Sequence, residues 1–379
     1  MADTTISGLS RILTTSTGAI VPISIGGVTS GIPVSGIITA SGDVGGALPI
    51  PTGTTAQRPV APSSGMLRFN TTLNTLEIYN NGFWLGLAQA TSSTGTVTTV
   101  YNYTGLDVSF TVPAGITSIS VKMWGGGGSS VNPDIAGGGS GYTGGTKTVT
   151  AGQVYLVSVG GGASIAHVGG YNGGGNVGDN SYNSTYGSGG GGGYSGIFLN
   201  NKSFATAVAI AGGGGGGAGQ GGGLKGGAGG GTTGSDSAGG GSGNYWGASG
   251  GKGGTQTAGG AAGQGSSNVL YIGSQLQGGR GQPSGGYGPG GGGGGGYYGG
   301  GGGYGYFQTV AAGGGGGGSG YSGGLTSNIN TVQGDNPDNN TGLPGNPNDS
   351  DRGGAGQGGK GLNAAGSNGK IIISYTYPQ

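Results

Sequence analysis

The chain has 379 residues, of which 112 are glycine, and its 12 basic residues nearly balance its 11 acidic ones. It contains no cysteine and one histidine, which excludes disulfide scaffolds, thiol catalysis, Cys/His zinc sites and most catalytic triads. Nucleic-acid binding needs clustered lysine and arginine, so we expect no nucleic-acid partner. The composition also argues against an enzyme and gives no sign of a cofactor.

The composition divides the chain into three segments. The amino terminus lacks the apolar run of a secretory signal, and no stretch approaches the roughly 20 apolar residues of a membrane span. We therefore expect a soluble chain whose mature form starts near Met1. Glycine is sparse before residue 105 and dense from Gly125 to Lys370. With a Thr/Ser-rich linker at 90–98, this predicts segments at 1–50, 51–100 and 101–379.

A small β meander is predicted in the middle segment. Met66–Asn70 and Leu76–Tyr79 alternate in polarity around the turn residues 70–74, and Asn80, Asn81 and Gly82 form a second turn signal. This meander is too short to bury its own apolar face, so self-association is the expected remedy.

Strands are also predicted within the glycine-rich segment, because helical periodicity is nearly absent and β-branched residues are common outside the glycine runs. In 116–124, Ile119, Val121 and Met123 alternate with polar residues, which predicts one buried and one wet face. The predicted strands are 107–112, 116–124, 153–160, 205–211 and 370–376.

Long glycine runs separate these strands, and their default interpretation is a flexible linker. The interspersed strands favour order instead. Fixing glycine costs about 0.5–1 kcal/mol more per residue than fixing alanine, so an ordered run needs many compensating interactions. Collagen is excluded because glycine is not confined to every third position.

The remaining interpretation is a bundle of extended helices with three residues per turn, of the polyproline-II type. These helices make no internal hydrogen bonds, so their amide groups can pair with neighbouring chains, and only glycine allows so close an approach. Non-glycine residues would lie at helix ends and on outer faces. The predicted lattice interior consists of the runs 125–128, 189–193, 212–217, 290–296 and 313–318.

Few residues are candidates for catalysis or metal binding. His167 has no acidic neighbour in sequence and is expected to be a polar loop residue. The aspartates at 335, 338, 349 and 351 could hold calcium, although a solvated loop is the preferred interpretation because no known calcium-binding pattern matches.

Tyrosine is more informative, since 19 are present. Tyr142, Tyr194 and Tyr321 occur in a repeated GGxGY motif and are expected to cap the exposed sides of the bundle. For the other clusters, recognition and structure remain equally open, because aromatic rings offer rigid contact area and suit sugars. The candidate receptor-binding residues are Tyr182, Tyr186, Tyr245, Trp246, Tyr297 and Tyr298.

Several stretches of the sequence resemble parts of known proteins. Val112–Gly128, Ala207–Gly217 and Lys370–Tyr375 resemble landmarks of a glycine-rich domain found in phage tail fibres and some extracellular receptors. This resemblance covers about 105–379 and implies a β-sandwich carrying packed polyglycine-II helices. Thr54–Trp84 is similar to a short module of phage fibre and virion proteins, which implies a homotrimer. The first 40 residues weakly resemble fibre attachment ends.

These resemblances predict an all-β virion protein, a fibre or adhesin. Segment 1–50 would attach it to other virion proteins, 51–100 would form a small β module and neck, and 101–379 would bind a host-surface glycan or outer-membrane protein. The alternative is a purely structural head-fibre, neck or decoration protein. A polysaccharide-degrading enzyme ranks last, because it needs paired carboxylates and Glu77 is the sole glutamate. Loss of such an activity on Asp179→Asn would revive it.

Overall fold

The computed structural model describes residues 20–25, 28–33, 50–87, 95–165, 168–178, 187–219, 224–238, 249–263, 268–284, 288–305, 312–335 and 341–377. Its regular elements are β-strands apart from short 3-10 turns, so the predicted all-β class is confirmed. No helix among these residues has the length and hydrophobicity of a membrane span. The chain forms two compact units, 1–92 and 93–379.

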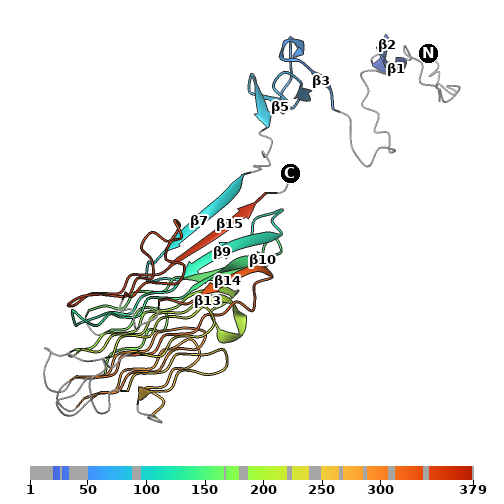
Figure 1. Cartoon of the computed structure of the whole chain (residues 1–379). Helices are drawn as coiled ribbons and strands as arrows, with labels where there is room; N and C mark the ends of the chain where they lie inside the picture. Colours follow the sequence, from blue (N-terminus) through green and yellow to red (C-terminus); the bar gives the residue numbers. More distant parts are fainter. Residues whose placement is uncertain are drawn as a thin grey trace. The chain divides into compact units, whose positions relative to one another are not determined.

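The first unit contains a hairpin and a small sheet (Figure 1). Strands β1 (Ile20–Ile25) and β2 (Val28–Pro33) pair antiparallel. Most of the predicted attachment segment 1–50 lies outside the described residues. The small sheet has the order β3-β4-β5-β6, comprising Thr52–Gly53, Leu67–Asn70, Thr75–Asn80 and Phe83–Leu87.

Both predicted turns of this small sheet are confirmed. Asn74 has a φ of 48° between β4 and β5, and Asn81 and Gly82 have φ of 47° and 88° between β5 and β6. Positive φ at two successive turn residues is the geometry of a type I′ hairpin, which asparagine and glycine adopt with little strain.

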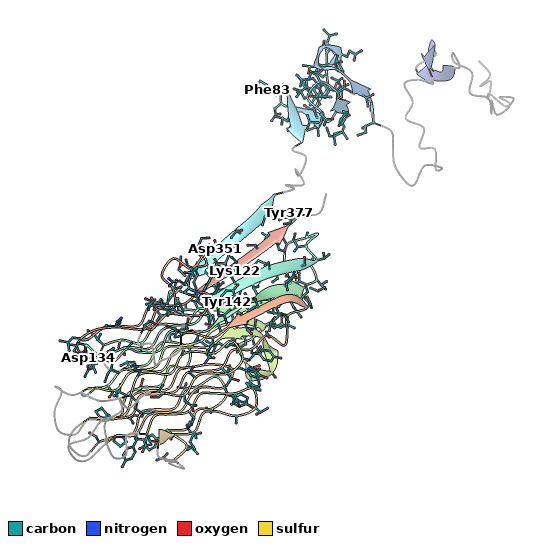
Figure 2. The ribbon with its side chains drawn as sticks, in the orientation of Figure 1. Phe83, Lys122, Asp134, Tyr142, Asp351 and Tyr377 are labelled. Atoms are coloured by element: carbon teal, nitrogen blue, oxygen red, sulfur yellow. The ribbon has the colours of Figure 1, made fainter. Side chains whose placement is uncertain are left out.

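The small sheet buries its polar face and exposes its apolar face. Arg68 and Glu77 pair across β4 and β5 and are 5% and 0% exposed. The next row of the pairing joins Leu67, Ile78 and Leu85, and Leu67 and Leu85 are exposed. Phe83 projects from the same unit and is also exposed (Figure 2). The prediction that this sheet leaves its apolar face uncovered is confirmed.

The second unit begins with a β-sandwich. One sheet has the order β14-β10-β9-β15-β7 and the other β13-β12-β11-β8. The apolar core between them draws on Val121 and Ile371 from the first sheet and on Tyr155 and Ile197 from the second. The bounds are β7 Thr96–Asn102, β8 Val108–Thr111, β9 Ser118–Trp124, β10 Tyr142–Thr148, β11 Val154–Ser158, β12 Ser195–Leu199, β13 Ala207–Ala211, β14 Ser327–Val332 and β15 Lys370–Thr376.

All five strands predicted in this unit are present, within about three residues of the predicted ends, whereas β7, β10, β12 and β14 were not predicted. The linker assigned to 90–98 is wrong at its carboxyl end, because β7 starts at Thr96 and pairs with β15. The predicted boundary at 100/101 likewise falls inside β7. Threonine-rich sequence was read as linker here, although threonine favours strands when the neighbouring strand provides a partner.

The last strand of the unit occupies the interior of its sheet. β15 pairs antiparallel with both β9 and β7, and Ile373 lies opposite Val121 on one side and Thr99 on the other. Because β7 opens the unit and β15 closes it, the two ends of the unit lie side by side (Figure 1).

Strands of the sandwich continue directly into glycine tracts. β9 ends at Trp124 and the run 125–128 follows, and β13 ends at Ala211 before the run 212–217. In the opposite direction, tract 137–141 leads into β10 and tract 189–193 leads to Tyr194 and β12. The tracts therefore run outward from the sandwich as parallel and antiparallel rows (Figure 1).

Tract 212–217 shows how these rows pack. Its amides donate to three tracts: Gly213 and Gly216 to the carbonyls of Gly295 and Gly292, Gly214 and Gly217 to those of Gly126 and Ser129, and Gly215 to that of Gly227. Its carbonyls accept from three other tracts, at 189–192, 138–141 and 315–318.

Each direction of pairing in this tract repeats every three residues, and three donor directions plus three acceptor directions make six neighbours. That is the hexagonal packing of threefold extended helices, so the proposed lattice of paired main chains is present. The five predicted runs are buried within it.

The expected place of the repeated tyrosines was wrong. Tyr142 and Tyr194 are buried, at 4% and 3% exposure, rather than capping exposed sides of the bundle. Tyr142 packs on Trp124 and Tyr194 on Phe198, while Tyr321 is half-buried and bridges to Ile210. The repeated motif marks the points where a glycine tract meets the sandwich, and a large ring fills the space between the two kinds of packing.

Candidate functional site

The structure describes two of the six candidate receptor-binding residues. Tyr182, Tyr186, Tyr245 and Trp246 lie outside the described residues, as do His167 and Asp179. Tyr297 and Tyr298 follow the lattice run 290–296 and are half-buried.

Tyr297 and Tyr298 belong to a group of four rings, called here the aromatic stack, with Phe204 and Tyr321. Tyr297 lies between Phe204 and Tyr321, with ring centroids 4.1 Å apart on each side and interplanar angles of 16° and 15°. Tyr298 meets Phe204 and Tyr297 edge to face, at 5.2 and 5.6 Å. Such arrangements are favoured by the ring quadrupoles.

Three elements hold the aromatic stack at the seam between sandwich and lattice. Phe204 lies in η4 (Phe204–Thr206), the turn between β12 and β13. Tyr321 is fixed by its pair of backbone hydrogen bonds with Ile210, and the Tyr297 amide donates to the carbonyl of Ser319. Burial, and then the neighbouring Tyr321 and Tyr298, raise the pKa of Tyr297, so its hydroxyl stays protonated at neutral pH.

The stack limits what a ligand can reach. Because Tyr297 has a ring on each face, a sugar cannot stack on it without separating Phe204 or Tyr321. Tyr298 has only edge-to-face neighbours, and Gln275 Nε2 lies 3.4 Å from its hydroxyl. Of the two, Tyr298 is the better placed for contact with another molecule, and both assignments remain predictions.

The aspartates considered for calcium are engaged elsewhere. Lys122 places its ammonium 3.0 Å from Asp349 Oδ2 and 2.8 Å from Asp351 Oδ2, where a cation between the two carboxylates would lie (Figure 2). Asn346 also donates to Asp349. Burial works to raise the pKa of Asp349, but hydrogen bonds from Lys122 and from the Asp351 amide outweigh it, and the pKa is lowered.

Calcium ligation at 335–351 is therefore not supported. Asp335 accepts a hydrogen bond from the Thr341 hydroxyl, and Asp338 lies outside the described residues. In the part of the chain that the structure describes, no three His, Cys, Asp or Glu residues are grouped to hold a metal ion.

A polar group that sequence reasoning missed lies between sandwich and lattice; we call Asp107, Ser158, Tyr171, Asn172 and Lys202 the Lys202 cluster. Lys202 Nζ is 2.8 Å from Asp107 Oδ2 and 3.0 Å from Asn172 Oδ1. Asp107 Oδ1 accepts from the hydroxyls of Ser158 and Tyr171. Asn172 Nδ2 donates to Ser158 Oγ at 2.6 Å.

Burial and charge shape this cluster. Ser158 and Asn172 are buried, whereas Asp107 and Lys202 are about one-fifth and one-quarter exposed. Burial works to raise the pKa of Asp107, but hydrogen bonds from Lys202 and Ser158 outweigh it, so its pKa is lowered. The Lys202 ammonium also lies 5.0 Å from the centre of the Tyr171 ring. Four separate segments supply these residues, so no local motif could have revealed the cluster.

The first unit has its own buried charge. Glu77 accepts bidentate hydrogen bonds from Arg58, at 3.2 and 2.7 Å, and one from Arg68 at 3.2 Å. Trp84 lies within 6.0 Å of both guanidinium groups. Arg68 and Trp84 also line a pocket of about 640 Å³, together with residues that include Ile50, Met66 and Leu67.

The chain matches no protein-family model, and a search of curated proteins returned no match.

Proposed function

We propose that this protein is a fibre or adhesin of a phage virion, which displays a rigid glycine-rich domain toward the host surface. The observation that supports this most is the lattice in which tract 212–217 pairs with six neighbours. A network of main-chain hydrogen bonds holds its shape without a large apolar core, which suits a protein that must present loops stiffly outside a cell.

Contact with the host falls, in this proposal, to the segments that join the lattice tracts and to Tyr298. Tyr182, Tyr186, Tyr245 and Trp246 all lie in such segments of the sequence. With 12 basic and 11 acidic residues the chain offers little electrostatic steering, so ring contacts with a surface glycan or an outer-membrane protein fit better than charge recognition.

The first unit would serve assembly. Its exposed apolar sheet face, which includes Leu67, Leu85 and Phe83, is uncharged and would be covered by self-association, consistent with a homotrimer. In this proposal, segment 1–50 attaches the protein to other virion proteins, and the protein resides in the virion.

Competition for adsorption tests the host-binding role. The purified full-length chain is added to host cells before the phage, and the fraction of phage adsorbed is measured. We expect it to reduce adsorption, and the double variants Tyr182→Ala/Tyr186→Ala and Tyr245→Ala/Trp246→Ala to compete at least tenfold less well. Ile329→Ala, at a 50% exposed residue in strand β14 of the sandwich, is the control and should compete as the parent does. Unimpaired competition by both double variants would refute the assignment of these residues.

The second candidate is a structural head-fibre, neck or decoration protein. The observation that favours this role is again the lattice, since a hydrogen-bonded bundle would also suit a protein that protects the particle. Labelled antibody on intact particles separates the two: label at the tail tip supports the adhesin, and label on head or neck supports the structural role. In either case we propose that the protein is not an enzyme.

A further inference from the structure

The Lys202 cluster brings together the groups that an amide exchange between side chains requires. Lys202 Nζ lies 3.0 Å from the carboxamide oxygen of Asn172 and 2.8 Å from Asp107 Oδ2. An amine attacks an acyl carbon from about 3–3.5 Å, and Asn172 Cγ is bonded to the oxygen that Nζ contacts, so a change in the side-chain torsions of Lys202 brings Nζ to that distance. An ion pair between Lys202 and Asp107 alone would not require the buried carboxamide of Asn172 beside it.

Asn172 is fixed in this position by its own backbone. Its φ is 66°, its carbonyl accepts the amide of Tyr194 at 2.9 Å, and the preceding carbonyl of Tyr171 accepts the amide of Gly161 at 3.0 Å. The side-chain Nδ2 donates to Ser158 Oγ and to the carbonyl of Tyr194. The carboxamide is therefore held in one orientation, with its oxygen toward Lys202.

We propose that Lys202 and Asn172 become joined by an intramolecular isopeptide bond, with Asp107 transferring protons and Ser158 relaying them. This proposal concerns the protein's own covalent structure and does not depend on the host-binding role.

The reaction balances without an oxidant or other reagent. The Lys202 ammonium gives a proton to Asp107 Oδ2, and the neutral amine attacks Asn172 Cγ, so that the Nζ–Cγ bond forms and the carbonyl electron pair moves to Oδ1. When the carbonyl reforms, the Cγ–Nδ2 bond breaks and Nδ2 leaves as ammonia. Nζ gives up a second proton as the adduct collapses. Nδ2 takes this proton and the one held by Asp107, so one ammonium ion is released and Asp107 is again a carboxylate.

The structure contains a path for the proton that the leaving nitrogen needs. Ser158 Oγ lies between the two groups: its hydroxyl donates to Asp107 Oδ1, and it accepts from Asn172 Nδ2 at 2.6 Å. In the adduct both hydrogen bonds reverse: Ser158 Oγ takes the proton from the Asp107 carboxyl group and gives its own hydroxyl proton to Nδ2. Burial works to raise the pKa of Asp107, but hydrogen bonds from Lys202 and Ser158 outweigh it and lower this pKa, so the carboxylate is a weak proton acceptor and the reaction is slow.

The bond would tie the two parts of the second unit together. Lys202 follows β12 of the sandwich, whereas the neighbours of Asn172 in sequence pair with the lattice glycines 161 and 191. A covalent link here would resist separation of lattice from sandwich under force.

Intact mass spectrometry of the full-length chain tests the proposal. Purified protein is incubated at 37 °C until its mass is constant, and we expect a mass about 17 Da below that of the sequence, the loss of one ammonia. Trypsin should then leave the bond after Lys202 uncut. Chymotryptic digestion should give a branched peptide that joins Lys202 to Asn172.

Variants separate this reaction from other losses of ammonia, such as succinimide formation at Asn-Gly pairs. Lys202→Arg keeps the charge but removes the nucleophilic amine, and Asp107→Asn removes the proton acceptor; both should show the full sequence mass. Lys225→Arg is the matched control and should retain the deficit. A parent mass equal to the sequence mass, or a deficit that persists in Lys202→Arg, would overturn the proposal.

Discussion

Gly214 lies so close to Gly138 that a Cβ atom on Gly214 would be 1.9 Å from the carbonyl oxygen of Gly138. Real carbon atoms do not approach an oxygen so closely, and the obstacle is main chain that is itself hydrogen-bonded on other sides. The glycine content of the lattice is therefore required by the spacing between chains.

A single methyl group in the lattice should therefore be costly. We expect Gly214→Ala to reduce the free energy of unfolding by about 3 kcal/mol or more, because neighbouring tracts must separate. Gly217→Ala, where the nearest atom would be 3.0 Å away, is the control in the same tract and should cost clearly less. Denaturant unfolding measures both, and equal losses would contradict the packing argument.

The central place of β15 leads to a second prediction. Ile373 is fully buried between β9 and β7, so Ile373→Ala should cost about 2–5 kcal/mol of stability. Ile329→Ala, in edge strand β14 and 50% exposed, should change stability by less than about 0.5 kcal/mol. Calorimetric unfolding compares the two, and a small effect of Ile373→Ala would argue against β15 as an interior strand.

Glu77 predicts a pH dependence of the first unit. The hydrogen bonds from Arg58 lower the pKa of Glu77, although burial opposes them. A carboxylate whose folded pKa is depressed adds stability that is complete above its unfolded value of about 4.3 and is lost as pH falls through the folded value. The thermal midpoint of this unit should therefore fall as the pH is lowered from about 5 to 3.

The matched variant is Glu77→Gln. It should lower the midpoint at neutral pH and flatten the dependence below pH 5, because the two arginines lose their carboxylate. Asp236→Asn removes a solvent-exposed partner of Lys252 and should leave the first unit's midpoint unchanged. A parent protein whose midpoint does not vary between about pH 5 and 3 would disprove the role of Glu77.

The position of Lys122 predicts that calcium does not change the stability of the protein. Since its ammonium occupies the space between Asp349 and Asp351, millimolar calcium or EDTA should leave the thermal midpoint of the parent protein unchanged. Lys122→Ala removes the competing cation and should show a lower midpoint without added ions. A calcium-dependent rise in the parent's midpoint would show that an ion displaces Lys122.

The geometry of the aromatic stack predicts that Tyr297 contributes more to stability than Tyr298. Tyr297 contacts three rings, so Tyr297→Ala should cost about 2–3 kcal/mol, at roughly 0.5–1.5 kcal/mol per aromatic pair together with lost packing. Tyr298→Ala removes two edge contacts and should cost about 1 kcal/mol less. Denaturant unfolding of both variants tests the order, and a larger loss for Tyr298→Ala would reverse the assignment.

Sequence patterns predicted strands where side chains alternate, as in Ile119, Val121 and Met123, and predicted the lattice where glycine runs leave no other ordered structure. They failed for β10, whose sequence contains Gly144 and Gly145, and for β14, which carries four polar residues among its six. These strands are stabilised by the neighbours they pair with, β9 and β10, and not by local preference.

The site was harder to predict than the fold. Tyr142 and Tyr194 stand beside glycine runs in sequence, but whether a ring points to solvent or into a seam depends on where a tract meets a strand. The Lys202 cluster joins residues from 107 to 202. Pairing of β11 with β8 and β12 brings Asp107, Ser158 and Lys202 together, and the segment of Asn172 is bonded to Tyr194 just before β12. Local sequence patterns cannot predict contacts between residues so far apart in the chain.

The continuity of sandwich strands with glycine tracts also explains how runs of identical residues reach one pairing register. A stretch of identical residues can slide past its neighbour by one repeat and regain the same bonds, so it contains no information about its own register. Trp124 and Ala211 anchor two such runs in a core of distinct side chains. The sandwich thus fixes the register of the runs attached to it. The tracts that pair with these runs then take the same register.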